Sequence, residues 1–272
     1  MIRVRKGPEP EELAVSGYSA DAVKAQLIAD QDGKCYLCER EVGTDYEVEH
    51  LKSQRNHEKL TNVWTNLFLA CSYCNGRKSD GFDEILDPAK ANVEQLVIQR
   101  YDAKSETFQF ETLSKDDVAA ALTVQLLGRL FNGLRPKMPT LKEERFRAEF
   151  RQAYNLFVSR INAYLENQTE AARACVLSEL AVKAEYLGFK YWLIMSDPHL
   201  RKTFEPAMKW NRQNMALPTN RQSSTDDLIW ADFRSDENRG ADWQFGTCRK
   251  GHGPQSQHPD HESRGGEPPH DG

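Results

Sequence analysis

Two cysteine pairs with identical spacing constrain the fold of this chain more than any other feature of its sequence. Two residues separate Cys35 from Cys38, and two separate Cys71 from Cys74. Four thiolates arranged in this way supply a complete tetrahedral ligand set for Zn²⁺ and leave no coordination position open for a substrate. The pattern therefore predicts a structural zinc site. The alternative is that the cysteines form two accidental pairs of buried residues.

The stretch between the two pairs is long for a zinc ribbon. It contains 32 residues, whereas about 15–20 are usual in such sites. An insertion must therefore lie between the two zinc knuckles, and this insertion carries His50 and Asn66.

The N-terminal sequence bears on how these cysteines are used. MIRVRKGPEPEEL has no apolar segment of the kind found in signal peptides. No stretch of the chain approaches the roughly 20 apolar residues of a membrane span. We therefore expect a cytoplasmic protein without a membrane partner. In that reducing compartment, paired cysteines bind metal more often than they form disulfides, which favours zinc.

The charge balance excludes one simple route to nucleic-acid binding. The chain of 272 residues has a formal net charge of -5 and a sequence pI of about 5.9. A protein with this balance has no global positive field to attract phosphate. Any phosphate recognition must come from a local patch, a bound cation or a partner subunit.

Local patterns predict a strand, a loop, a second strand and a helix around the cysteines. The alternation in DYEVEH (45–50) and the apolar run VWTNLFLA (63–70) predict the two strands. SYCNGRKSD (72–80) is expected to form a short helix. Residues 1–19 are expected to be extended and to lead into an amphipathic helix over 20–31.

The second half of the chain is predicted to be mainly helical. A hairpin is expected first, from LVIQRYD (96–102) and TFQFETL (107–113). Ser114 with Asp117 and Thr140 with Glu143 resemble capping boxes. Apolar residues that recur every three or four positions predict helices over 115–131, 141–166, 170–186 and 198–210, with Gly188 between the last two. Beyond about residue 216 the chain becomes polar and is predicted to be disordered.

The order of motifs in the first part resembles that of a known enzyme family. A strand ending in Glu49-His50, a second strand with Asn66-Leu67, and Asn75 directly after Cys74 are together similar to the HNH nucleases of the ββα-metal class. This resemblance covers about residues 31–80. The opening KGPEPEEL, followed by this core, looks more narrowly like the PtuB-type HNH nucleases of Septu and related retron anti-phage systems, which work beside an ABC-type ATPase (PtuA-like).

The resemblance implies a role for each motif residue. His50 is expected to be the general base that deprotonates water, with its other ring nitrogen held by a backbone carbonyl. Asn66 is expected to brace the loop that carries this base. Glu49 and Asn75 are expected to hold the catalytic cation, Mg²⁺ or Mn²⁺. Two positions depart from the family pattern, since Asn75 replaces the usual histidine and Glu49 replaces a common aspartate.

Each of these residues also has a plainer explanation. Asn66 could cap a turn, and Asn75 could cap the zinc knuckle. Arg77 and Lys78 belong either to an ordinary solvated helix face or, because they follow Asn75, to a surface that contacts substrate phosphates. We expect phosphate contact for this basic pair.

The predicted function is that of a metal-dependent endonuclease. The fold class is α+β: a ββα-metal HNH core on a four-cysteine zinc site, followed by a mainly helical C-terminal region. The expected division is an HNH nuclease domain at 1–113, a helical partner-docking domain at 114–215 and a polar, largely disordered tail at 216–272. The substrate is DNA by default, with RNA as an open alternative, and the enzyme would be the nuclease effector of an anti-phage complex with the ATPase.

Two other classes of protein remain as alternatives. One is a zinc-stabilised adaptor that binds nucleic acid or protein without cutting, although His50 argues against it. The other is a stand-alone homing or restriction enzyme. We rank this last because the sequence has no helix-turn-helix or basic region for reading DNA.

Overall fold

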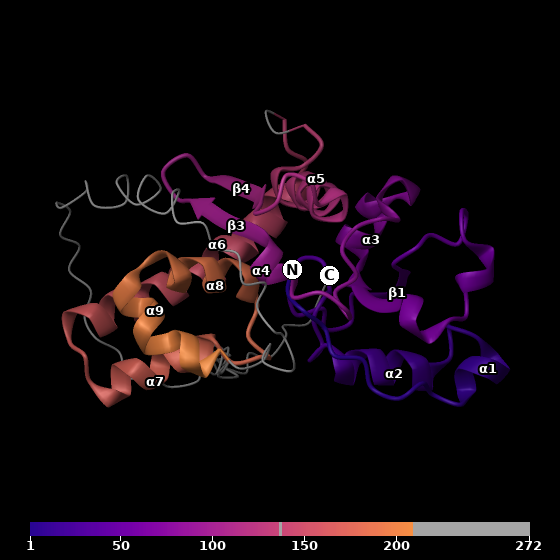
Figure 1. Cartoon of the computed structure of the whole chain (residues 1–272), viewed down its shortest axis with the longest axis horizontal. Helices are drawn as coiled ribbons and strands as arrows, with labels where there is room; N and C mark the ends of the chain where they lie inside the picture. Colours follow the sequence, from indigo (N-terminus) through magenta and orange to yellow (C-terminus); the bar gives the residue numbers. More distant parts are fainter. Residues whose placement is uncertain (136–137, 209–272) are drawn as a thin grey trace, which may run out of the picture. The chain divides into compact units, whose positions relative to one another are not determined.

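Two pairs of short strands, each preceded by helices, occupy the first part of the chain, and helices follow, which gives an α+β fold (Figure 1). The structure is a computed structural model that describes residues 1–135 and 138–208. All of the described residues fall within one unit of mutually contacting chain, Met1–Trp230. The predicted tail, 216–272, lies outside the described residues.

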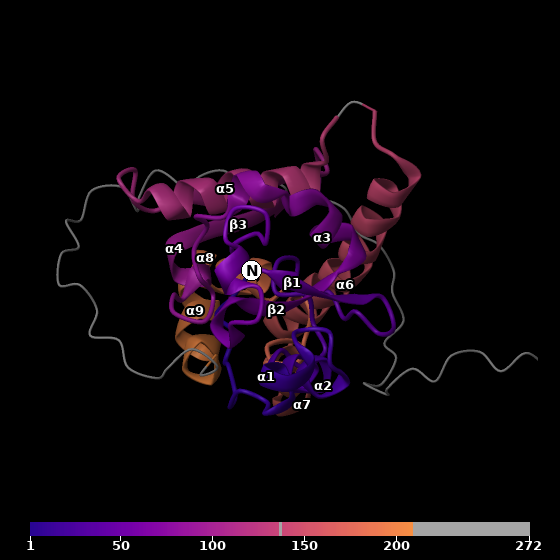
Figure 2. The same cartoon turned by 90° about the vertical axis from the view of Figure 1, so that its right-hand side faces the viewer.

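The first sheet contains the predicted pair of strands. Strand β1 (Tyr46–His50) pairs antiparallel with β2 (Leu67–Cys71), and His50 lies opposite Leu67. Helix α3 (Ser72–Lys78) follows β2 at once, so the predicted strand, strand and helix are confirmed (Figure 2). The second strand begins later than predicted because Trp64–Asn66 form a 3₁₀ turn, η2. Every residue of β2 is buried, which explains why its sequence reads as an unbroken apolar run.

Two helices precede this sheet. Helix α1 (Glu12–Ser16) occupies part of a segment that was predicted to be extended, and its buried residue is Leu13. Helix α2 (Asp21–Asp30) was predicted, and it buries Val23 and Leu27. Gly17, at a φ of +74°, ends α1. This backbone conformation suits glycine and lets the chain turn sharply from α1 towards α2.

The predicted second hairpin is also present. Strand β3 (Val97–Asp102) pairs antiparallel with β4 (Thr107–Thr112), and the short helix α4 (Val93–Leu96) leads into it (Figure 1). Further 3₁₀ turns lie at Glu58–Leu60 (η1), Asp80–Phe82 (η3) and Glu205–Ala207 (η4).

The two longest helices lie close to the ranges that their sequence predicted. Helix α5 (Val118–Asn132) is capped by Asp117. Helix α6 (Leu141–Glu166) begins with the capping box between Thr140 and Glu143 that the sequence predicted.

The predicted helix over 170–186 is wrong in its second half. Helix α7 (Glu170–Glu179) ends seven residues before the predicted 186, and α8 (Leu187–Ser196) begins after Tyr186, which has a left-handed φ of +53°. The next helix, α9 (Pro198–Phe204), ends six residues before the predicted 210, and residues 209 and 210 lie outside the described part. Gly188 does not interrupt a helix. It lies in the first turn of α8, and a Cβ there would come within 2.4 Å of the Gln99 amide.

One hydrophobic core joins the zinc-site segment to the helices. Tyr73 of α3 stacks on Phe146 of α6 with ring centroids 4.3 Å apart. Phe108 of β4 lies 5.1 Å from Phe131 of α5. A second cluster packs α6 against α7, α8 and α9. The boundary at 113 therefore falls within a shared core, and the division into domains stays a prediction.

Within residues 1–135 and 138–208, no helix combines the length and the apolar content needed to cross a bilayer.

Candidate functional site

The four cysteines of the two pairs converge at one buried point. Their ligand atoms all lie within 4.8 Å of one another, and Cys38 Sγ is 3.9 Å from Cys71 Sγ. A tetrahedral zinc site with Zn–S bonds of about 2.3 Å requires sulfurs about 3.8 Å apart. Cys35, Cys38, Cys71 and Cys74 therefore fit a structural zinc ion.

The thiols also need a cation to ionise together. Hydrogen bonds from Cys35 and the other two thiols hold the pKa of Cys71 far below its usual value. Burial raises the pKa of Cys38 and Cys74 well above the usual thiol value. A bound zinc ion would compensate the charge of all four buried thiolates.

His50 lies at the end of β1 with its ring largely buried. Its Nε2 is 2.9 Å from the backbone carbonyl oxygen of Thr61. Because a carbonyl oxygen only accepts, this contact assigns the ring proton to Nε2 and leaves the lone pair on Nδ1. Burial lowers the pKa of His50, and the positive charge of Lys78 lowers it further, against the opposing effect of the Thr61 carbonyl. The imidazole is thus neutral at neutral pH, as a general base requires.

Asn66 ties together the two ends of the loop that follows His50. Its Oδ1 accepts the backbone N–H of Lys52 at 2.8 Å. Its Nδ2 donates to the carbonyl oxygens of Lys52 at 3.0 Å and Leu60 at 3.2 Å. These bonds hold the chain that leaves His50 against the turn that supplies the Thr61 carbonyl. The sequence predicted that Asn66 braces this loop, and its role in catalysis stays a prediction.

Glu49 and Lys78 form an ion pair beside His50, in which the Lys78 side chain is buried and that of Glu49 is 12% exposed. Lys78 Nζ lies 3.0 Å from Glu49 Oε1 and donates to the His50 carbonyl oxygen at 2.9 Å. Burial raises the pKa of Glu49, while the Lys78 charge opposes this rise. Lys78 is only 1% exposed. This placement differs from the expected phosphate contact, because the ammonium group is enclosed by the protein.

Asn75 faces strand β1 from helix α3. Its Nδ2 donates to the carboxylate of Glu47 rather than to Glu49. Glu47 and Glu49 are two residues apart on β1, so both lie on the same face of the strand. The two carboxylates and the Asn75 amide are oxygen donors of the kind that Mg²⁺ prefers, and this donor set fits a hard cation. Glu47 was missed by the sequence prediction, although the alternation in YEVEH could have indicated it.

Arg77 is held against helix α6. Its Nη2 lies 3.3 Å from Glu143 Oε1, and its guanidinium carbon is 3.9 Å from the centre of the Tyr73 ring. Its side chain is 17% exposed. A phosphate contact by Arg77 stays a prediction.

Asp83 holds the loop that follows His50 through hydrogen bonds to Ser53 and Asn56. Its carboxylate accepts the Ser53 backbone N–H at 2.7 Å, the Ser53 hydroxyl at 2.9 Å and the Asn56 amide at 2.8 Å. Burial alone would raise the pKa of Asp83, but these hydrogen bonds outweigh it and lower the pKa. Asp83 carries no motif signal in the sequence, so only the structure identifies it.

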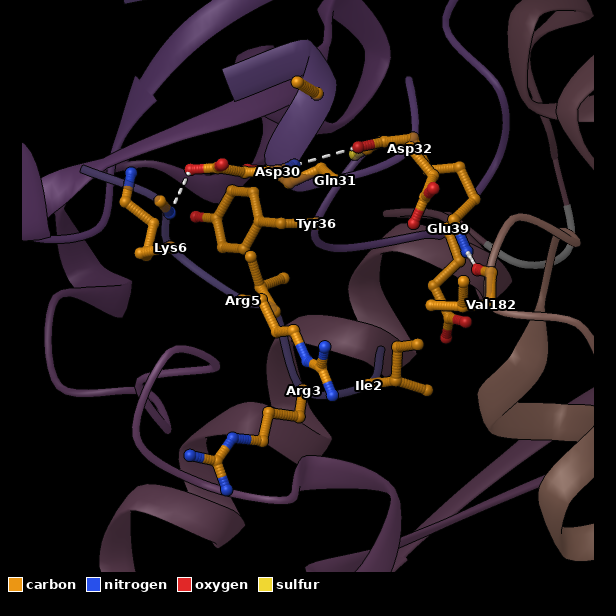
Figure 3. A pocket seen from close by; sticks show the side chains of 15 residues that line it. Ile2, Arg3, Arg5, Lys6, Asp30, Gln31, Asp32, Tyr36, Glu39 and Val182 are labelled. Carbon is orange, nitrogen blue, oxygen red and sulfur yellow. Dashed lines mark hydrogen bonds between the residues drawn. The ribbon is translucent and has the colours of Figure 1, made fainter. Parts of the chain in front are cut away.

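A cavity of about 530 Å³ lies beside the first cysteine pair, and His50 does not line it. The segment Ile2–Gly7 and residues of 29–36 line it, and Figure 3 shows their side chains. Among the described residues that line it, Cys35 is the one predicted site residue, while His50 lies elsewhere. Several of its charged groups are already bonded within the protein, since Asp30 accepts the Gly7 N–H at 2.8 Å and Lys34 donates to the Ala184 carbonyl at 2.9 Å.

The comparisons with known proteins agree with the geometry around His50. Residues 35–81 match the family model described as HNH endonuclease. This range contains the four cysteines, His50, Asn66 and Asn75. No curated protein and no solved structure matches the chain. Residues 35–81 are therefore a domain of the HNH endonuclease type, which supports nuclease activity.

Proposed function

We propose that this protein is a metal-dependent HNH endonuclease that hydrolyses phosphodiester bonds through His50. The observation that carries the proposal is the contact between His50 Nε2 and the Thr61 carbonyl oxygen at 2.9 Å, within the segment that matches the HNH family. This contact leaves the lone pair on Nδ1, which would accept a proton from a water molecule. The water oxygen then bonds to phosphorus while the P–O bond to the leaving 3′ oxygen breaks, and the leaving oxygen takes up a proton from solvent. The Thr61 carbonyl would then stabilise the imidazolium that forms.

The neighbouring residues support this chemistry without taking part in proton transfer. Asn66 holds the loop, and Lys78 fixes both the His50 carbonyl and the Glu49 carboxylate. Glu49 and Asn75, with Glu47 beside them, would hold Mg²⁺ or Mn²⁺. When bound, this cation would supply positive charge to the scissile phosphate and to the leaving oxygen.

We further propose that the nuclease works in the cytoplasm as the effector of an anti-phage complex with an ABC-type ATPase. The support for this proposal is the PtuB-like opening KGPEPEEL followed by the HNH core. The helices beyond residue 113 would provide the docking surface. DNA is the proposed substrate, and RNA is the alternative that the experiment must separate.

The test compares His50→Ala with the parent protein, each purified alone and together with a candidate ABC-type ATPase partner. Single- and double-stranded DNA and tRNA are offered with Mg²⁺ or Mn²⁺. Cleavage should fall by roughly 10²–10⁴, the usual effect of removing a positioned base. His199→Ala is the matched control, because His199 is exposed on α9. Glu49→Ala and Asn75→Ala should instead raise the metal concentration needed for half-maximal cleavage.

Two results would overturn this proposal. Equal cleavage by His50→Ala and the parent would remove the catalytic assignment. A parent complex that binds these nucleic acids, carries zinc and cuts none of them with either cation would favour the adaptor. Failure to copurify with the ATPase would contradict only the proposed complex and would leave the nuclease assignment in place.

A further inference from the structure

We propose that Tyr18, which lies outside the segment that matches the HNH family, is a positioning residue for the His50 imidazole. The inference rests on the proposed nuclease function. Tyr18 lies between α1 and α2. Its ring meets the His50 ring edge to face, with centroids 4.7 Å apart and planes at 82°. Aromatic rings attract one another in this geometry, so the contact restricts rotation of the imidazole.

The backbone of Tyr18 is fixed to the same turn that holds His50. The Tyr18 N–H donates to Asn62 Oδ1 at 2.9 Å. Asn62 directly follows Thr61, whose carbonyl oxygen is 2.9 Å from His50 Nε2. One turn of the loop therefore sets the position of both rings, and a shift of that turn would move them together.

Gly17 allows this close approach. Its φ of +74° belongs to the region that favours glycine, and a Cβ there would lie 3.2 Å from Asn62 Oδ1. A larger residue would be strained and would press on the amide that anchors Tyr18. The short link between α1 and α2 is thus shaped to bring the tyrosine onto the loop.

Gln54 covers the imidazole from a different direction. Its Nε2 is 3.2 Å from His50 Nδ1 and 3.1 Å from His50 Nε2. The two ring nitrogens flank one carbon, so nearly equal distances place the amide over the ring face rather than in line with either lone pair. The imidazole is therefore held by a carbonyl at Nε2, an amide on its face and the tyrosine ring. The proposed function assigns the proton transfer to Nδ1, which lies beside the Gln54 amide.

The kinetic test compares Tyr18→Leu with Tyr18→Phe in the complex with its partner. The leucine variant loses the aromatic ring, and its kcat should fall about three- to tenfold with little change in KM. The phenylalanine variant keeps the ring and should stay within about twofold of the parent. Asn62→Ala should repeat the loss, while Asn62→Asp, which keeps an acceptor oxygen, should lose less. Zinc content and Tm are measured for each variant, so that a folding defect is recognised.

A second measurement does not depend on activity. The ring signals of the seven histidines are recorded by NMR, and the His50 signal is assigned by its absence in His50→Ala. The Tyr18 ring current should shift this signal, and the shift should disappear in Tyr18→Leu but persist in Tyr18→Phe. An unchanged His50 signal in Tyr18→Leu would show that the rings are not in contact.

The outcomes separate this inference from the proposed function. If His50→Ala abolishes cleavage while Tyr18→Leu cuts like the parent, only the role of Tyr18 is wrong. If His50→Ala cuts like the parent, the nuclease assignment fails and the inference fails with it. If Tyr18→Leu lowers cleavage further in a His50→Ala background by the same factor, Tyr18 does not act through His50 and the inference is wrong.

Discussion

Lys78 is buried and pairs with the mostly buried Glu49 beside His50, so a lone charge at this pair would be costly. Lys78→Met would leave the Glu49 carboxylate without its partner at 3.0 Å. Removing one member of a buried pair typically costs about 3–5 kcal/mol of folding free energy. We expect a loss of this size in urea denaturation of the zinc-loaded protein. Glu49→Gln/Lys78→Met removes both charges and should recover part of it. A double variant as unstable as Lys78→Met would show that the charge pair is not the cause.

Glu94, which lies outside the candidate site, makes the stability of the fold depend on pH. It is fully buried, and burial raises its pKa to about 7, against the opposing effect of the Arg3 N–H donated to it at 2.9 Å. The folded protein therefore binds this proton more tightly than the unfolded chain. The resulting stability is complete below about pH 4.5 and is lost as the pH rises through about 7.

Glu94→Gln should remove this dependence because the amide stays neutral. The parent loses folding free energy between pH 5 and pH 8, and the variant does not. The difference in unfolding free energy between variant and parent should therefore shift in favour of the variant by about 3 kcal/mol over this range. Urea denaturation at both pH values measures the change. Glu58→Gln, at an exposed position of η1, is the control and should show no such trend. An equal difference at both pH values for Glu94→Gln would contradict the assignment.

Sequence could name some residues of the site but not all of their surroundings. The cysteines, His50 and Asn66 could be identified because motif order and short spacings are local properties of the chain. Tyr18 lies far before His50 in the sequence, and no spacing rule connects the two. The burial of Lys78 could not be predicted either, because it depends on how α3 packs against β1.

At the scale of elements, the start of α5 tests how capping was predicted. The sequence suggested Ser114 as the first cap, yet Asp117 accepts the Ala120 N–H at 2.9 Å, and Ser114 bonds to Thr112 through its backbone. Asp117→Ala should cost about 1 kcal/mol of folding free energy. Ser114→Ala should stay within about 0.5 kcal/mol. Thermal and urea denaturation of the two variants decide, and a larger loss for Ser114→Ala would restore the sequence-based assignment.

Elements with clear periodicity were predictable, and α8 was not. Helix α6 has a capping box and apolar residues on one face, so its bounds followed from its sequence. Helix α8 contains the apolar run GFKYWLIM and buries Leu187, Phe189 and Ile194, as well as Lys190. A helix surrounded by protein shows little amphipathic pattern, so its sequence gives no helical signal. Gly188 then looked like a helix breaker, whereas the structure uses it to admit the Gln99 side chain.

At the scale of the whole described chain, the zinc knuckle is bonded to the helices that follow it. Arg40 Nη1 lies 2.8 Å from Glu149 Oε2 on α6. The Glu41 N–H donates to Glu185 Oε1 at 2.8 Å, and the Gly188 N–H lies 3.2 Å from the Glu39 carboxylate. Sequence could not foresee these contacts, because they join positions more than 100 residues apart. These contacts thus stabilise residues 39–41 and the helical part of the chain against each other.

This arrangement predicts that zinc removal loosens more than the cysteine cluster. Without the metal, four buried thiols would lose the interaction that fixes residues 35–41, and the bonds from Arg40, Glu41 and Glu39 would loosen with them. We expect a chelator or Cys38→Ser to increase amide hydrogen exchange in α8 and in β3–β4, as well as around the cysteines. Cys175→Ser is the matched control, because Cys175 lies on α7 outside the cluster. Faster exchange confined to residues around the four cysteines, with α8 as protected as in the zinc-loaded parent, would mean that the helical region is stable on its own. The bonds across the knuckle would then be consequences of the fold rather than part of what holds it together.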